Sequence, residues 1–138
     1  MKKLLACIFT IATLAACNKD NRPPDANEDA LTAFGGKYLV CDSVKTTVNG
    51  STTTQILGKG KGWDIIFGLY GNLQVNSTPV AYKNYSYESP DKIYYWPVSS
   101  SYLTNQYYTI ISITSNKLVL KDTDASSGKI YTEYFTAE

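Results

Sequence analysis

The thiol of Cys17 has the most specific chemical setting in this sequence. Leu-Ala-Ala at 14–16 precedes it, an apolar run covers 4–14, and Lys2 and Lys3 open the chain. A basic start, a short apolar stretch and small residues before a cleavage point are typical of a secretory signal peptide. The apolar run is shorter than the ~20 residues that a membrane-spanning helix needs. The sequence therefore predicts a secreted chain whose leader is removed.

The set Leu14-Ala15-Ala16-Cys17 resembles the lipobox of bacterial lipoproteins. This resemblance implies that residues 1–16 are cut off, that Cys17 is lipidated, and that the membrane is a partner through that lipid. It also implies localisation to the cell envelope at the outer membrane, where more than one acyl chain anchors a protein firmly. The alternative is an ordinary cleaved signal in which Cys17 is incidental. Because 18–30 hold no large apolar residue, we interpret 17–33 as the lipidated cysteine and a flexible tether.

The rest of the composition excludes several classes of chemistry. The chain has no His, which removes His-based triads, general bases and metal ligands. Its 13 Lys plus Arg against 12 Asp plus Glu leave no basic surface for nucleic acid. Cys41 remains alone once Cys7 is cleaved off and Cys17 is acylated, so we expect a buried thiol and no intramolecular disulfide. We expect no enzyme, no metal, no cofactor and no nucleic-acid partner.

Three weaker patterns have plain structural interpretations. Asp122, Asp124 and Glu133 have the spacing of an EF-hand loop, but flanking helices are absent, and we expect a polar hairpin loop. The glycines over 58–62 lack the strand–loop–helix setting of a phosphate loop. Asp64, in a strand, is interpreted as a solvated surface group.

The chain after residue 34 predicts an all-β domain, 34–138. It is rich in Val, Ile, Thr and Tyr, which suit strands, and no stretch shows convincing helical spacing. Asn49-Gly50 is a strong hairpin signal. Strands are expected near 37–46, 52–57, 62–69, 72–76, 81–87, 92–97, 106–114, 117–122 and 129–136. Short links predict an antiparallel up-and-down meander of eight to nine strands that closes as a barrel, with a β-sandwich as the alternative.

Alternation along each strand predicts which side chains face inward. The residues expected inside are Trp63, Ile65, Phe67, Ile93, Tyr95, Leu118, Leu120, Ile130, Thr132 and Tyr134. The same parity places four aromatic residues outside: Tyr94, Trp96, Tyr131 and Phe135.

Gly36-Lys37-Tyr38 at the start of the first strand resembles the Gly-x-Trp opening of lipocalins. The Phe67…Gly71-Asn72 turn and the late pairing of 108–110 with 118–120 are similar to small lipocalin-like domains of Gram-negative lipoproteins. The resemblance covers roughly 34–136. It implies a barrel whose interior can hold one small apolar ligand.

Two functional hypotheses follow. In the first, the lipid-anchored barrel binds a small apolar or amphipathic ligand through an inner set of residues: Tyr38, Trp63, Phe67, Tyr95 and Tyr134. In the second, the domain is a surface module with a filled core, and an outer aromatic face of Tyr94, Trp96 and Tyr131 grips a glycan or an envelope protein. In both cases we expect a monomer.

Overall fold

The computed structural model describes residues 25–77, 79–88, 90–100 and 106–138. The expected signal peptide and Cys17 lie outside the described residues. Within these ranges, no helix has both the length and the apolar character needed to cross a bilayer.

The described residues form one helix and nine strands. The helix is α1 (Ala26–Thr32), and the strands are β1 (Tyr38–Val48), β2 (Ser51–Ile56), β3 (Asp64–Phe67), β4 (Asn72–Asn76), β5 (Ala81–Glu88), β6 (Lys92–Pro97), β7 (Tyr107–Ile113), β8 (Lys117–Thr123) and β9 (Ile130–Ala137). Each strand coincides with one that the sequence predicts. Short apolar or Thr-rich runs between turn residues are strong enough local signals to specify strands without tertiary information.

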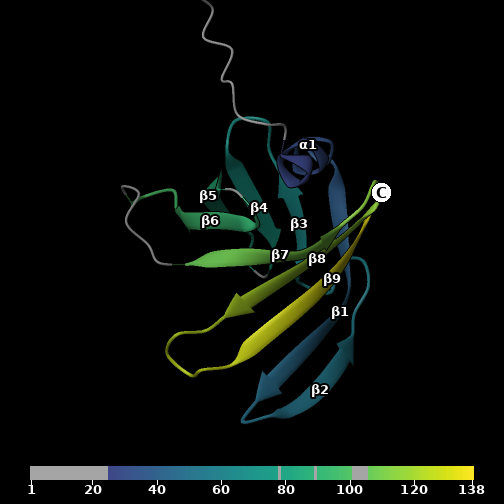
Figure 1. Ribbon diagram of the computed structural model, residues 1–138, viewed down its shortest axis with the longest axis vertical. Helices are drawn as coiled ribbons and strands as arrows, with labels where there is room; N and C mark the ends of the chain where they lie inside the picture. The colour runs from purple at the N-terminus through teal and green to yellow at the C-terminus, as the bar shows by residue number, and fades with distance from the viewer. Residues whose placement is uncertain (1–24, 78, 89, 101–105) are drawn as a thin grey trace, which may run out of the picture.

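The strands make a closed antiparallel barrel of eight strands plus one extra strand (Figure 1). Neighbours pair in chain order from β3 to β9, and β9 returns to pair with β1 over Leu39–Thr47. The architecture is that of a lipocalin-like meander barrel, so the barrel prediction is confirmed and the sandwich alternative is wrong. Closure removes the free sheet edges that an open meander would leave.

The extra strand arises because β1 changes partner along its length. Tyr38 and Leu39 pair with β3, whereas 43–48 pair with β2, which projects from the barrel away from α1 (Figure 1). Between the two ladders, the Asp64 side chain takes the place of a backbone partner and accepts from the Cys41 N–H at 2.9 Å. Asp64 also accepts from the Tyr38 hydroxyl at 2.8 Å and the Gly60 N–H at 2.7 Å. Its side chain is fully buried, so the expectation of a solvated Asp64 is wrong.

Helix α1 lies at one end of the barrel and contributes to its core (Figure 1). The Asp25 side chain caps it by accepting from the Asn27 N–H at 2.9 Å. Leu31 and Phe34 are buried against the barrel interior. The sequence does not predict this helix, because seven residues are too few to show a helical repeat. Residues 25–33, inside the segment expected to be a tether, are therefore part of the ordered structure.

Candidate functional site

The inner face of β9 is the reverse of the one that the sequence predicts. In the β8–β9 ladder, Leu118 lies opposite Phe135 and Leu120 lies opposite Glu133. Directly paired residues share a face, and both leucines are buried in the core. Phe135 and Glu133 therefore face inward, with exposures of 1% and 3%. Alternation predicts the wrong face for β9 because Glu133, its charged residue, is buried.

Polar side chains gather inside the barrel at the end opposite α1, where each of the strands β5 to β9 supplies one inward residue. The Tyr95 hydroxyl donates to Asp122 Oδ2 at 3.1 Å. The Lys83 ammonium lies 4.2 Å from the centroid of the Tyr95 ring. The Tyr108 ring packs against Tyr95 with centroids 4.6 Å apart. Together with Glu133, we call these residues the inner polar cluster.

Burial dominates the electrostatics of the inner polar cluster. Desolvation raises the pKa of Glu133 to about 8, helped by the charge of Asp122 and opposed by that of Lys83. Desolvation also lowers the pKa of Lys83 and raises the pKa of Tyr95 well above its ordinary value. Near neutral pH, Glu133 is therefore mostly protonated. A cluster of perturbed groups at one end of a barrel is a candidate functional site.

Two aromatic residues lie beside this cluster at the same end. Trp63, just before β3, contacts Tyr131 of β9 with ring centroids 5.9 Å apart. Trp63 is 37% exposed, and Tyr131 packs on the core from the inner face. Tyr131 therefore belongs to the interior, and its assignment to the outer aromatic face is wrong.

The other predicted inner residues divide between the two faces. Phe67 is fully buried near α1 and packs edge-on against Tyr85 at 5.1 Å. Tyr38 and Tyr134 face outward, so their assignment to the interior is wrong. Tyr38 reaches Asp64 under the loop that precedes β3, and Tyr134 lies beneath Lys45, whose ammonium is 5.0 Å from the ring centroid. The inner site that the sequence predicts is thus reduced to Trp63, Phe67 and Tyr95.

The half of the barrel nearer α1 is filled by side chains. Seven inward residues expose 0–1% of their surface: Leu39, Phe67, Leu73, Ile93, Leu118, Leu120 and Phe135. A side chain without accessible area cannot line a space large enough for water. Within the barrel, this half therefore leaves no room for a ligand.

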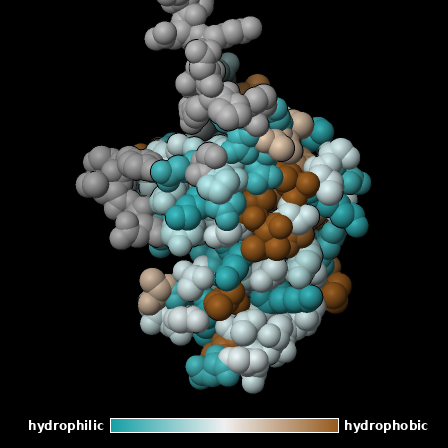
Figure 2. All heavy atoms as spheres, in the orientation of Figure 1, coloured by the Kyte–Doolittle hydropathy of each residue, from teal (hydrophilic) through white to brown (hydrophobic). Residues whose placement is uncertain are grey.

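The outer wall carries a second set of aromatic residues. Tyr94 and Trp96 lie on the outer face of β6, opposite in parity to Ile93 and Tyr95, as the sequence predicts. Tyr94 packs against Tyr107 of β7 with centroids 5.4 Å apart. Elsewhere on the outside, hydrophobic residues gather over β7 and β8 below α1 in the view of Figure 2.

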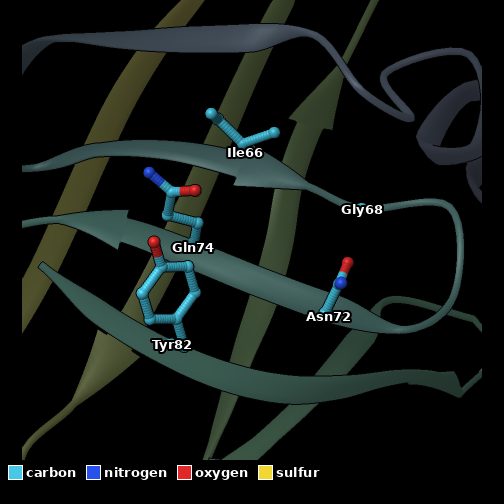
Figure 3. A pocket seen from close by; sticks show the side chains of 5 residues that line it. All are labelled: Ile66, Gly68, Asn72, Gln74 and Tyr82. Carbon is cyan, nitrogen blue, oxygen red and sulfur yellow. The ribbon is translucent and has the colours of Figure 1, made fainter.

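A shallow hollow of about 80 Å³ lies on the outer face of β3, β4 and β5 (Figure 3). Its lining is Ile66, Gly68, Asn72, Gln74 and Tyr82. Tyr82 is 63% exposed, and the amide of Gln74 donates to Asn76 Oδ1 at 2.6 Å. Ligand pockets usually run to ~300 Å³ or more, so this hollow is well below the usual size.

The weaker sequence motifs fold as ordinary loops. Asp124 accepts from the Ser126 N–H, the Ser126 hydroxyl and the Ser127 hydroxyl, at 2.9, 2.6 and 2.5 Å. These bonds, that of the Ser126 hydroxyl first, lower the pKa of Asp124. Glu133 points into the barrel, away from that loop. Among the described residues, no group of three or more acidic or Cys side chains could hold a metal ion.

Cys41 is a free, fully buried cysteine, as the sequence predicts. Burial, followed by the charges of Glu133 and Asp64, raises the pKa of its thiol to about 12. A thiol with so high a pKa is a poor nucleophile near neutral pH.

No protein-family model matches this sequence, and neither a curated protein nor a solved structure matches it. The class that the fold defines is a lipocalin-like meander barrel. The function is therefore inferred from the geometry of the sites alone.

Sequence reasoning missed Lys83, Asp122 and Glu133 as members of one site. The EF-hand spacing draws Asp122 into a polar hairpin loop, and alternation along β9 predicts that Glu133 faces outward. One signal was available: Asp122 shares the parity of Leu118 and Leu120, which were expected inside. Extending that alternation by one more step predicts an inward carboxylate at the end of β8.

Proposed function

We propose that this chain is a lipid-anchored protein of the cell envelope whose barrel binds a small amphipathic ligand at the end opposite α1. The inner polar cluster is the observation that supports this proposal. Burying ionisable groups costs desolvation free energy even where they are hydrogen-bonded, and a filled apolar core would be the cheaper way to close the barrel. A bound polar group offsets that cost.

The arrangement suggests how such a ligand binds. The rings of Trp63 and Tyr131 offer apolar contact at the rim, with large area and little entropy cost. Lys83 and Asp122 are the half-buried charged members of the inner polar cluster, and they meet the polar head. Because the half nearer α1 is filled, the ligand stays shallow, with its tail at the rim rather than deep in the barrel.

Energy transfer from Trp63 tests this binding mode. The Trp96→Phe variant leaves Trp63 as the single tryptophan of the chain. Titration with a dansyl-labelled fatty acid and a dansyl-labelled fatty amine should give saturable transfer with one of the two. If the acid binds, Lys83→Met should weaken it about tenfold, the value of one lost charge-assisted bond; if the amine binds, Asp122→Asn should do so.

Lys121→Met is the matched control, because Lys121 lies on the outer face of the barrel, opposite in parity to Leu120 and Asp122. Its affinity should equal that of the parent. Transfer with neither probe, or equal losses in Lys83→Met and Lys121→Met, would contradict the proposed site.

The lipid anchor has its own test. Metabolic labelling with a palmitate analogue should mark the parent chain and leave Cys17→Ser unlabelled. Label retained on Cys17→Ser would contradict the anchor and leave the barrel site untouched.

The hollow on β3–β5 supports a second candidate, binding of a glycan to the outer wall. Exposed Tyr82 beside the amides of Asn72 and Gln74 combines a stacking face with paired donors and acceptors, which suits a sugar (Figure 3). Tyr82→Ala should abolish retention on immobilised envelope polysaccharide, whereas Tyr134→Ala should not. Equal retention of both variants would exclude this face.

A further inference from the structure

The connection between β3 and β4 exposes two large apolar side chains at its tip. Leu69 is 75% exposed and Tyr70 is 94% exposed. Turn tips usually carry Gly, Asn, Asp or Ser, which tolerate water and tight backbone geometry. Here the flanking glycines, Gly68 and Gly71, meet the backbone requirement, with a φ of 75° at Gly71. The two exposed residues are thus not needed to make the turn.

This tip is held in place by hydrogen bonds. The Gly68 N–H donates to the Asn72 carbonyl at 2.7 Å, and the Tyr85 N–H donates to the Gly71 carbonyl at 2.7 Å. The Tyr85 hydroxyl also donates to the Gly68 carbonyl at 3.2 Å. Leu69 and Tyr70 are therefore presented on a fixed support, which lowers the entropy cost of any contact they make.

The tip lies at the α1 end of the barrel, where the described chain begins (Figure 1). The Gly36 N–H donates to the Phe67 carbonyl at 2.7 Å, and a β-carbon at Gly35 would lie 3.0 Å from Leu69 Cδ2. Cys17 precedes Asp25, the cap of α1, by eight residues. Even fully extended, a segment of that length spans at most about 28 Å. A lipid on Cys17 would therefore hold the α1 end of the barrel close to the membrane.

We propose that Leu69 and Tyr70 contact the interface of the lipid bilayer that carries the anchor, and so orient the barrel with the inner polar cluster away from the membrane. This inference rests on the lipid anchor of the proposed function. Tyr is suited to the interface because its ring is apolar and its hydroxyl remains hydrated. Two side chains alone partition weakly, but the anchor raises their effective concentration at the surface.

The charged side chains at the α1 end of the barrel favour one type of lipid headgroup. Asp25, Glu28 and Asp29 lie in or next to the first turn of α1. These carboxylates repel strongly anionic headgroups, so the contact should be favoured on zwitterionic phosphatidylcholine. Lys37, Lys92 and Lys117 also lie at this end, but Glu88 and Asp91 add two further carboxylates, so the acidic groups there still outnumber the lysines.

Fluorescence quenching on vesicles tests the contact with the complete lipidated chain. Tyr70→Cys and Tyr82→Cys are each labelled with an environment-sensitive dye and reconstituted in phosphatidylcholine vesicles that contain headgroup spin-labelled lipid. Tyr82 is the matched control, a tyrosine 63% exposed on the barrel wall. Cys41 stays unlabelled because it is fully buried. The dye at 70 should be quenched at least about threefold more than the dye at 82, since only interfacial side chains meet the spin label.

A second substitution separates contact by the tip from simple proximity. Leu69→Asp in the labelled Tyr70→Cys chain should reduce the quenching, whereas Ile56→Asp, at an equally exposed position of β2, should not. Equal quenching at 70 and 82 in a chain that sediments with vesicles would overturn this inference and leave the anchor standing. A parent chain that does not sediment with vesicles would overturn both.

Discussion

Glu133 of β9 lies directly opposite Leu120 of β8, so its carboxyl group occupies the inner face of the barrel beside the apolar core. Every neighbouring inward position on these two strands towards α1 is apolar: Leu118, Leu120 and Phe135. Towards the other end, Asp122 and Tyr131 follow. Glu133 thus marks the boundary between the filled half of the barrel and the half in which we place ligand binding.

Stability should fall as pH rises through the range in which Glu133 ionises. Its pKa is about 8 in the folded chain against an ordinary value of 4.5. A raised pKa means that folding favours the protonated acid, so the stabilisation is complete below about pH 4.5 and is lost as pH rises to about 8. The loss amounts to roughly 3–5 kcal/mol. Urea unfolding at pH 5 and at pH 8.5 measures it.

Glu133→Gln should remove most of this pH dependence, because the amide is neutral at every pH. The Gln variant should be more stable than the parent at pH 8.5. Glu88→Gln, on the outer face of β5, is the control and should keep the parental slope. The same slope in Glu133→Gln and the parent would show that another group carries the effect.

The reversed face of β9 predicts unequal costs for two adjacent aromatic residues. Phe135→Ala should destabilise the domain by about 3–5 kcal/mol, because it empties a fully packed position in the core. Tyr134→Ala should cost about 1 kcal/mol, since it loses only partial burial and the contact with Lys45. The denaturant midpoints of the two variants measure these two costs. A larger loss of stability in Tyr134→Ala than in Phe135→Ala would contradict the inward position of Phe135 and favour the face that alternation predicts.

The strands were predictable because their signals are local, whereas the errors concern partners far apart in the sequence. Alternation fails on β9 because aromatic residues lie on both faces, and the one clear marker, Glu133, is buried. The expectation that Tyr38 lines the inner site is wrong because its hydroxyl meets Asp64, 26 residues away. No pattern in the sequence marks the point at which β1 changes its partner from β3 to β2, where Asp64 accepts from the Cys41 N–H.

Asp64 should contribute strongly to stability, because its carboxylate accepts three hydrogen bonds at the point where β1 changes its partner strand. Asp64→Ala leaves the buried N–H of Cys41 without an acceptor, and we expect it to lower the free energy of unfolding by about 2–4 kcal/mol. Asp64→Asn should cost less, because one side-chain oxygen still accepts. Asp42→Ala is the control: its carboxylate accepts from the exposed Thr136 hydroxyl, and its loss should cost under about 1 kcal/mol. Equal midpoints for Asp64→Ala and Asp42→Ala would contradict this role.

Gly68 should resist substitution because the Asn72 side chain fills the space beside it. A β-carbon at position 68 would lie 1.4 Å from Asn72 Oδ1, and the Asn72 carbonyl oxygen would be 3.1 Å away. Gly68→Ala must therefore push the Asn72 side chain out of the hollow, at a cost of about 1–3 kcal/mol.

Removing the obstructing amide should recover part of that loss. Gly68→Ala combined with Asn72→Ala should be less destabilised than the two single variants predict by addition, because the clash with Oδ1 no longer exists. Urea unfolding of the four chains gives the coupling energy. Strict additivity would show that the backbone carbonyl of Asn72, rather than its side-chain amide, sets the cost of a β-carbon at position 68.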